Sequence, residues 1–329
     1  MAEYEPPFHM SNIIVNLLME IGEQIGRITV LQPESVTPRL RKENRIRTIH
    51  ASLAIEHNSL SVEQVTAIIN GKRVLGNPNE IKEVENAYQA YELMTGLNPY
   101  SVDDLLRAHR LMMQGLINEN GKFRSGAVGI YAADMVVHVA PPAKFVSGQI
   151  KDLISWYQRS DMHPLVKSSI FHYEFEFIHP FADGNGRMGR LWHTILLGQW
   201  KELFYWLPIE TLIRSRQDGY YDALGRSDRE GDSSKFVEMM LSVIYDTLRN
   251  YEDSDQDSDQ DITSPLKRLL DVLGDGVMSA SEIMELMELS HKPTFRKNYL
   301  NPALERGLIE RTIPDKPNSR NQRYRKTKK

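Results

Sequence analysis

The sequence contains no cysteine among its 329 residues. Disulfide scaffolds, thiolate metal sites and cysteine nucleophiles are therefore excluded. The chain begins MAEYEPPFHM, which lacks the basic and apolar segments of a secretory leader. No uninterrupted apolar run approaches the roughly 18 to 20 residues that a membrane span requires. These absences predict a cytoplasmic protein with no membrane partner.

The remaining composition is that of a globular protein, with 41% hydrophobic and 26% charged residues. At roughly 100 to 200 residues per domain, the length predicts two domains. The net charge of −4 conceals an asymmetry. Residues 265–329 hold 14 Lys and Arg against 8 Asp and Glu, whereas residues 1–264 hold 26 against 36. The sequence therefore predicts a basic module that follows an acidic body.

Apolar residues recur with helical spacing through most of the first 250 residues. Thr37 and Pro38 resemble a helix start, and Ser61 with Gln64 forms a predicted capping box. An alternating stretch at about 126–140 predicts a β-hairpin. The body is thus predicted to be mostly α with one inserted hairpin, and its helices to cover about 38–56, 61–71, 79–95, 101–115, 147–159, 163–178, 185–200, 208–226 and 232–250.

Residues 252–264 read EDSDQDSDQDITS, an acidic stretch with too few apolar residues to form a packed structure. We expect a linker there. The residues after Pro265 predict a winged helix-turn-helix, with helices at about 266–273, 280–289 and 293–305 and strands at about 308–312 and 322–325.

The most informative stretch is His179–Arg190, which reads HPFADGNGRMGR. Pro180 ends the preceding helix, and a new apolar helical stripe opens directly after the glycines. Gly184 and Gly186 permit positive φ angles and close backbone approach. The backbone N–H groups that follow Gly184 can therefore converge at a helix N-terminus, which is an anion site suited to phosphate.

The charged residues of the same stretch extend this site. Arg187 and Arg190 lie three residues apart and suit the oxygens of a polyphosphate. Asp183 could supply one ligand to Mg²⁺, and His179 could act as a general base at neutral pH. A plain glycine turn would leave two arginines at a helix N-terminus unexplained, because the helix dipole disfavours them there. The chemistry indicated is phosphoryl or nucleotidyl transfer.

These twelve residues resemble the motif of the Fic (filamentation induced by cAMP) family, His-Pro-Phe-x-Asp/Glu-Gly-Asn-Gly-Arg-x-x-Arg. The resemblance implies a Fic-type helical bundle and transfer of AMP from ATP to a Ser, Thr or Tyr hydroxyl of a target protein or of the chain itself. Gly186 favours this reaction over phosphorylation, because the Doc-like kinase branch carries Lys at that place. The implied roles are His179 as base, Asp183 as Mg²⁺ ligand, Gly184, Asn185 and Gly186 at the α- and β-phosphates, Arg187 at the phosphates and Arg190 at the γ-phosphate.

The resemblance also implies functions for two further segments. The predicted hairpin falls where the family carries a flap that grips the target by strand addition, which assigns Val136, Val137 and His138 to target docking. A plain structural hairpin is the alternative. Tyr220 and Tyr221 belong to a segment that resembles the family's YYxAL stretch near the adenine, although aromatic residues at helical spacing usually lie in a core.

The segment from Ser52 to Glu56 resembles the family's inhibitory helix, in which the glutamate pairs with the second motif arginine, here Arg190. A glutamate at a helix C-terminus opposes the dipole and favours an outside cation, although a solvated Glu56 is the alternative. The sequence departs from the family at His57, where Gly or Asn is usual and Asn58 follows. We therefore expect the helix cap to be shifted by one residue.

The resulting division is an N-terminal helical region at 1–100 with the inhibitory helix at about 38–57, a catalytic core at 101–251, the linker at 252–264 and the winged helix at 265–329. The last module carries basic side chains that suit contact with a DNA backbone. A protein-docking role and simple solvation are alternatives, and a homodimer is left open. These basic residues are Lys292, Arg296, Lys297, Arg311, Lys316, Arg320, Arg323, Arg325, Lys326, Lys328 and Lys329.

Two other functions remain open on the sequence alone. The chain could be a DNA-binding regulator whose nucleotide site only senses ATP. Alternatively, Glu56 could position a water that removes AMP from a modified partner, as the resemblance implies for some members of the family.

Overall fold

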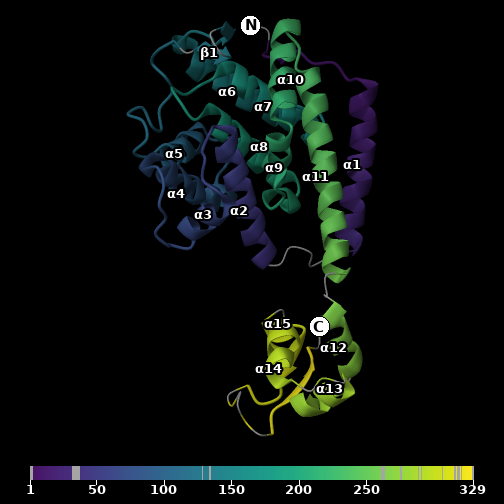
Figure 1. Cartoon of the computed structure of the whole chain (residues 1–329). Coiled ribbons are helices and arrows are strands. Elements are labelled where there is room, and N and C mark those ends of the chain that lie inside the picture. Colours follow the sequence, from purple (N-terminus) through teal and green to yellow (C-terminus); the bar gives the residue numbers. More distant parts are fainter. Residues whose placement is uncertain are drawn as a thin grey trace. The chain divides into compact units, whose positions relative to one another are not determined.

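A computed structural model describes two compact units, Met1–Tyr251 and Glu252–Lys329 (Figure 1). Each unit has a hydrophobic core of its own. None of the described helices is both long and apolar enough to cross a membrane. The described residues are 3–31, 38–127, 129–132, 135–260, 264–274, 276–287, 289, 291–305, 307–314, 316, 319 and 321–327.

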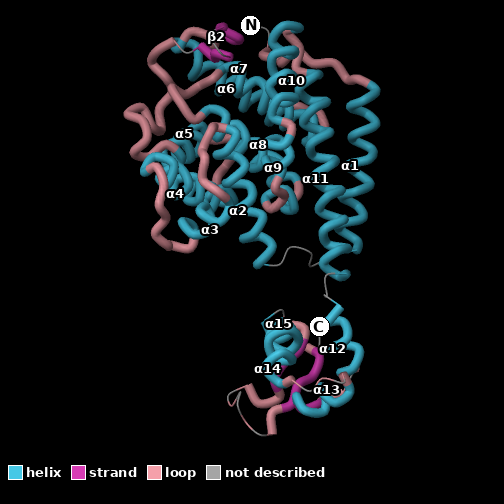
Figure 2. The backbone as a smooth tube through the Cα atoms, in the orientation of Figure 1, coloured by secondary structure: helices cyan, strands magenta, loops and turns pink. Residues whose placement is uncertain are grey.

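In the described residues of the first unit the regular structure is helical apart from one β-hairpin, which confirms the predicted mostly α body (Figure 2). The hairpin consists of β1 (Gly129–Ala132) and β2 (Met135–Val139). The helices are α1 (Asn12–Leu31), α2 (Pro38–Ile55), α3 (Val62–Ile69), α4 (Pro78–Leu93), η1 (Met94–Gly96), α5 (Val102–Met112), α6 (Ala143–Arg159), α7 (Pro164–Ile178), α8 (Asn185–Trp200), η2 (Glu202–Tyr205), α9 (Ile209–Ser215), α10 (Gln217–Glu230) and α11 (Ser234–Gln260).

Most helix boundaries follow the sequence signals, and the capping box at Ser61 is present. Two features differ. Helix α1 has no counterpart among the helices predicted from periodicity, because apolar residues occupy its exposed side (Ile13, Met19) as well as its buried side (Ile14). The single helix expected over 208–226 is two helices, since Arg216 leaves the helical conformation with φ −119° and ψ 31°.

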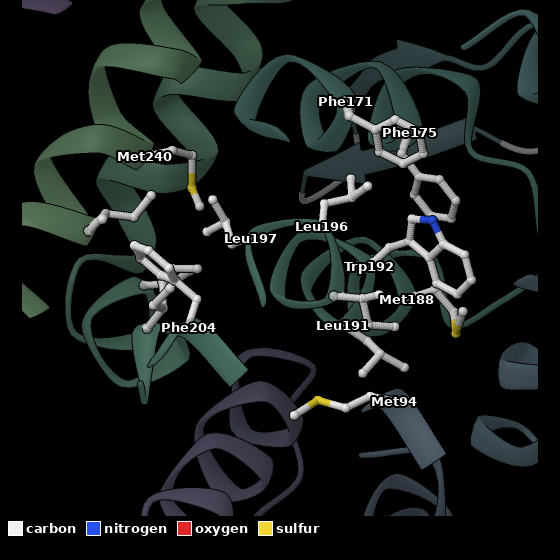
Figure 3. Packing of buried hydrophobic residues seen from close by; sticks show 14 of the residues in the cluster. Met94, Phe171, Phe175, Met188, Leu191, Trp192, Leu196, Leu197, Phe204 and Met240 are labelled. Atoms are coloured by element: carbon white, nitrogen blue, oxygen red, sulfur yellow. The ribbon is translucent and has the colours of Figure 1, made fainter. Parts of the chain in front are cut away.

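Helices α7 and α8 form the centre of the first unit and are buried along most of their length. Figure 3 shows Phe171 and Phe175 of α7 close to Trp192 and Leu196 of α8. Trp192 is fully buried, and its Nε1 donates a hydrogen bond to the carbonyl of Pro99 (3.1 Å). Because close-packed interiors resist deformation, this helix pair holds the loop between its ends in a fixed shape.

The expected linker is partly wrong. Residues up to Gln260 continue α11 as a helix, and residues 261–263 lie outside the described part of the chain. Adding a residue to an existing helix avoids the cost of nucleation, so a helix can extend into a polar stretch that would not fold alone. The boundary between the two units nevertheless falls at Tyr251 and Glu252, where the acidic stretch begins.

The second unit combines short helices with a three-stranded antiparallel sheet of order β3-β5-β4. The predicted N-cap Ser279 forms a capping box with Glu282. The predicted third helix is divided by a π-helical turn, and the short β3 was not predicted because it has only two residues. The elements are α12 (Ser264–Leu273), β3 (Met278–Ser279), α13 (Ala280–Leu286), α14 (Lys292–Phe295), η3 (Arg296–Leu300), α15 (Asn301–Glu305), β4 (Ile309–Arg311) and β5 (Arg323–Lys326).

Candidate active site

The motif begins where α7 ends, and it forms the predicted loop between two helices. His179 adopts a left-handed conformation with φ 48° and ψ 63°, and Pro180 follows it. This conformation costs a non-glycine residue about 1–2 kcal/mol, so other contacts must hold it. Gly184 has φ 84° and caps the start of α8. A Cβ on Gly184 would lie 2.6 Å from Sδ of Met113, so glycine is required there on both grounds.

The side chain of Asn185 holds the loop by hydrogen bonds to the backbone of Phe181. Its Oδ1 accepts a hydrogen bond from the N–H of Phe181, and its Nδ2 donates to the carbonyl of Phe181, both at 2.8 Å. The side chain is buried and engaged at both ends. A phosphate contact by Asn185 would therefore use its backbone N–H at the start of α8 rather than its side-chain amide.

His109 supports the same loop and was missed by the sequence analysis. Its Nδ1 accepts from the N–H of Gly121 (2.9 Å), so Nε2 carries the proton and donates to the carbonyl of Asp183 (3.0 Å). The ring stacks on Phe181 with centroids 3.7 Å apart. Burial lowers the pKa of His109 to about 4, which keeps it neutral. The sequence analysis could not assign His109 to the site, because it lies 74 residues from Asp183 in the chain.

The structure places Glu56 against Arg190, as expected, and it also brings Ser52 into contact with the same guanidinium. Nη2 of Arg190 lies 2.7 Å from Oε1 of Glu56 and donates to the carbonyl of Ser52 (2.9 Å), while Nε donates to Oγ of Ser52 (3.1 Å). Arg190 is only 2% exposed. Burial opposes ionisation of both partners, but their mutual attraction raises the pKa of Arg190 and lowers that of Glu56. Both groups are therefore charged at neutral pH.

The expected shift of the helix cap is wrong. His57 itself takes the left-handed position after α2, with φ 70°. Its N–H donates to the carbonyl of Ala54, and the N–H of Asn58 donates to that of Leu53, both at 3.1 Å. This pair of bonds is a Schellman motif, which normally places Gly or Asn where His57 stands. The helix therefore ends at the same position as it would with Gly or Asn, and His57 adopts a strained left-handed conformation there.

Gly186 leaves room for the ion pair. A Cβ at this position would overlap Oε1 of Glu56 and would lie 3.0 Å from Nη1 of Arg190. The carboxylate therefore reaches its arginine directly over the backbone of the motif. The close contact of Glu56 with the backbone requires glycine at position 186. A phosphate bound at the same place would require glycine for the same reason.

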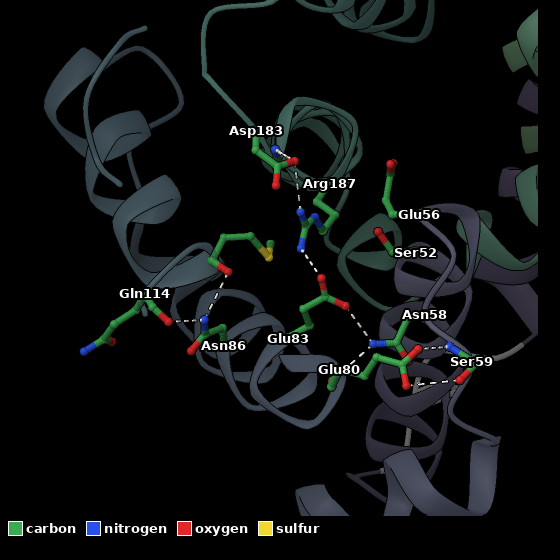
Figure 4. A network of polar contacts seen from close by, with 12 residues as sticks. Ser52, Glu56, Asn58, Ser59, Glu80, Glu83, Asn86, Gln114, Asp183 and Arg187 are labelled. Atoms are coloured by element: carbon green, nitrogen blue, oxygen red, sulfur yellow. Dashed lines mark hydrogen bonds and ion pairs between the residues drawn. The ribbon is translucent and has the colours of Figure 1, made fainter. Parts of the chain in front are cut away.

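Arg187 is held by a network of polar side chains from α4, from the motif loop and from the segment after α2 (Figure 4). Its Nη1 lies 3.3 Å from Oε1 of Glu83, and its Nη2 lies 3.4 Å from Oδ1 of Asp183. The other oxygen of Glu83 accepts from Nδ2 of Asn58 (2.8 Å). The segment that carries Glu56 thus contacts Arg190 directly and Arg187 through Glu83. Neither Glu83 nor Asn58 was assigned a site role from the sequence.

A second carboxylate, that of Glu176, is buried against α8 at Gly189. Glu176 is 8% exposed, and its Oε1 is 3.7 Å from Nε2 of His172. Gly189 leaves the necessary space, because a Cβ there would overlap Oε1 of Glu176. Burial raises the pKa of Glu176 to about 7, although His179 and Arg190 oppose the shift.

The two tyrosines predicted at the adenine differ in placement. Tyr220 is 1% exposed, its hydroxyl is 3.2 Å from Nε2 of His172, and its ring packs on Phe236, so it occupies a core position. Tyr221 is 46% exposed. Burial raises its pKa to about 12, and Glu56 adds to the shift. Of the two, only Tyr221 has surface available to a ligand.

The hairpin pairs antiparallel, with Ile130 opposite His138 and Tyr131 opposite Val136. The register shift between these pairs leaves Val137 as a bulge. Within the described residues the sheet consists of these two strands. Docking of a target by Val136, Val137 and His138 stays a prediction, because only the backbone of these residues is described.

The described residues contain no group of three or more His, Asp and Glu that could hold a metal ion. A magnesium ion held mainly by nucleotide phosphates needs only one or two carboxylates from the protein. Asp183 fits this requirement, because its side chain is 59% exposed next to the start of α8. Asp183 therefore suits a Mg²⁺ ion that is held mainly by nucleotide phosphates.

Fold and site together define a mostly helical protein with a glycine-containing loop between two buried helices. Comparison with known families supports this class. The Fic/DOC family model matches residues 99–197, and the model of the filamentation induced by cAMP protein Fic-like, C-terminal domain matches residues 264–327. A crystal structure of a Fic family protein from Desulfovibrio desulfuricans G20 is 53% identical, covers 99% of both chains and has a TM-score of 0.75. The chain therefore belongs to the Fic family.

More distant relatives carry names that state an activity. The protein adenylyltransferase Fic of Nematostella vectensis is 28% identical over 225 residues, which are 65% of this chain and 50% of the relative. The protein adenylyltransferase fic-1 of Caenorhabditis briggsae is 28% identical over 74% of this chain and 48% of its own length. The chain thus spans about half the length of the curated relatives it matches. The structure of Fic-1 from C. elegans, 23% identical over 75% of this chain and 74% of that one with a TM-score of 0.63, shares the fold.

Proposed function

We propose that this chain is a protein adenylyltransferase that moves AMP from ATP to a Ser, Thr or Tyr hydroxyl of a protein and is restrained by Glu56. The observation that supports this most is the ion pair between Glu56 and Arg190. The carboxylate of Glu56, the residue that follows α2, engages the arginine that the resemblance assigns to the γ-phosphate. The names of the relatives support AMP transfer at the level of the family.

In this proposal the nucleotide phosphates lie at the N-terminus of α8. The backbone N–H groups of Gly184, Asn185 and Gly186 bind phosphate oxygens, and the helix dipole adds to the attraction. Arg187 and Arg190 contact the phosphates with charge-assisted hydrogen bonds. Mg²⁺, when bound with ATP at Asp183, would neutralise phosphate charge.

His179 is the proposed base. Its Nδ1 lies 3.3 Å from the carbonyl of Glu176, and a proton donated along this contact makes Nε2 the basic nitrogen. Nε2 accepts the proton of the target hydroxyl as its oxygen attacks the α-phosphorus. The bond between the α-phosphorus and the bridging oxygen breaks, and pyrophosphate leaves. The product is a phosphodiester between AMP and the target side chain.

The target would be held by the hairpin. The unpaired edge of a two-stranded sheet can add an extended segment of another protein through backbone hydrogen bonds. In this proposal β2, with Val136, Val137 and His138, provides that edge, and Tyr221 contributes to the adenine site. Residues 1–100 then regulate the reaction, and residues 101–251 perform it.

Labelled ATP tests the proposal. The full chain carrying Glu56→Gly is incubated with ATP labelled at the α- or at the γ-phosphate, and label on protein is measured. We expect transfer from α-labelled ATP only, and none when His179→Ala is added. Transfer from γ-labelled ATP would instead support a kinase, and binding without transfer would support an ATP-sensing regulator. Faster loss of AMP than gain on a premodified protein would favour the reverse reaction.

The second unit carries a separate proposal, contact with a DNA backbone. Lys292 is exposed in α14 and Arg296 in η3, while Arg311 is exposed at the end of β4 and Lys316 in the segment that follows it. The full chain is titrated onto a fluorescent mixed-sequence duplex at several salt concentrations. We expect affinity to fall steeply with salt and to be lost in the double variant Lys292→Glu/Arg296→Glu. Salt-insensitive or undetectable binding would favour a protein-docking module.

A further inference from the structure

Arg124 lies just before the hairpin and is 3% exposed. Its guanidinium donates four hydrogen bonds, and each goes to a backbone carbonyl. At the end of α7, Nε donates to His179 (2.7 Å) and Nη2 donates to Ile178 (3.2 Å). On either side of the hairpin strands, Nη1 donates to Gly126 (2.9 Å) and Nη2 donates to Pro141 (2.5 Å). One side chain thus joins the motif loop to both ends of the hairpin.

The main chain of Arg124 strengthens this junction. Its N–H donates to the carbonyl of Pro180 (2.9 Å), so three consecutive carbonyls, at residues 178–180, accept from this one residue. The last carbonyls of a helix lack helical partners and carry the negative end of the dipole. A buried cation is well placed there. Burial lowers the pKa of Arg124, but a guanidinium remains charged in proteins.

The restraint matters because of where it acts. His179 has a positive φ of 48°, which a non-glycine residue adopts only when its surroundings impose it. The direction of its ring depends on that backbone conformation. A displacement of about 1 Å in a reacting group can cost on the order of 10²-fold in rate.

We propose that Arg124 is a positioning residue that sets the backbone of His179 and fixes both ends of the hairpin to it. The base and the strand edge that would hold the target are then placed relative to each other by one side chain. This inference rests on the proposed function for its catalytic consequence. The described hydrogen bonds of Arg124 go to residues 126, 141 and 178–180 and not to residues 183–190, so ATP binding should not depend on it.

Lysine cannot replace this arginine. The guanidinium is a planar fork whose N–H groups point in fixed directions, whereas an ammonium is a single compact group with three donors. A lysine at position 124 would keep the charge and most of the volume but could not reach carbonyls on both α7 and the hairpin. Arg124→Lys therefore tests geometry rather than charge.

The experiment uses the full chain carrying Glu56→Gly, with Arg124→Lys as the test and Lys122→Met as the matched control. Lys122 is exposed and lies two residues away. Three quantities are measured: the affinity for an ATP analogue whose bridge between the α- and β-phosphates cannot be cleaved, the rate of self-adenylylation from ATP, and hydrogen–deuterium exchange in peptides spanning residues 125–142. Melting temperatures show whether each variant is folded.

We expect Arg124→Lys to keep the analogue affinity within about twofold, to lower the rate by at least about 30-fold, and to speed exchange in the hairpin at least tenfold. The control should change none of these. Unchanged exchange would overturn the inference, and so would a rate within threefold of the parent. Loss of analogue affinity and melting temperature in proportion to the rate would show a folding role instead. If the Glu56→Gly parent transfers no AMP, the proposed function fails, and exchange alone decides the role of Arg124.

Discussion

Replacing Glu56 by glycine should activate the protein, because it frees Arg190 without touching the predicted base or metal ligand. In the structure one oxygen of Glu56 lies 2.7 Å from Nη2 of Arg190, whose side chain is almost fully buried. In the proposed function this guanidinium binds the γ-phosphate of ATP, and we expect the carboxylate to block that contact while it holds the arginine. The phosphates would then bind displaced from the geometry that in-line attack requires.

The size of the effect follows from the contact that must be broken. A hydrogen bond between charged groups contributes about 1.5–3 kcal/mol, and each ~1.4 kcal/mol changes a rate tenfold. Glu56→Gly should therefore raise the rate of adenylylation by about 10- to 150-fold. Ser52 keeps its two contacts with Arg190 in this variant, so the arginine stays in place for the phosphate.

Incorporation of α-labelled ATP into protein over time is the assay. Glu56→Gln is the matched control, because it removes the charge but keeps a hydrogen-bonding group, and it should give a smaller increase. Adding Arg190→Ala to Glu56→Gly should remove most of the gain. A Glu56→Gly protein no faster than the parent would refute the inhibitory pairing.

Three further outcomes test the local geometry. Because burial raises the pKa of Glu176 from 4.5 to about 7, the folded state binds more protons than the unfolded chain in that window and stability falls as pH rises through it. The difference in melting temperature between Glu176→Gln and the parent should therefore shift in favour of the variant as pH rises from about 5 to 8. A difference that does not change with pH would contradict this. His57→Gly should stabilise the fold by about 0.5–1 kcal/mol, measured by denaturant unfolding, because it relieves a left-handed φ; a loss of stability would contradict the strain argument. Gly186→Ala should cost about 1–3 kcal/mol in the parent but clearly less in Glu56→Gly, since its Cβ meets that carboxylate, and equal losses would show that the two residues do not touch.

The sequence predicted the parts of the site that depend on neighbouring residues. Within His179–Arg190, proline, glycine and arginine each have a local physical meaning, and the loop between α7 and α8 follows from them. The pairing of Glu56 with Arg190 came from a resemblance, and the ion pair in the structure agrees with it. The mostly helical body was predicted from the spacing of apolar residues, which is also a local property of the sequence.

The supporting residues could not be predicted because their partners are remote in the chain. His109 contacts Asp183 across 74 residues, and Glu83 contacts Arg187 across 104. Neither carries a local pattern that distinguishes it from an ordinary helix residue. Arg124 is similar, since its acceptors are backbone carbonyls, which every residue has. For Tyr220 the motif position suggested a ligand contact, whereas its 1% exposure agrees with the alternative of a core residue.

The mass added to the protein tests the central claim most directly. The Glu56→Gly chain is incubated with Mg²⁺ and an ATP analogue whose bridge between the β- and γ-phosphates cannot be cleaved, and its intact mass is then measured. AMP transfer breaks only the bond between the α- and β-phosphates, so we expect the mass of one or more adenylate groups, absent when His179→Ala is added. No added mass with the analogue, together with the mass of a single phosphate when ATP replaces it, would contradict adenylyl transfer.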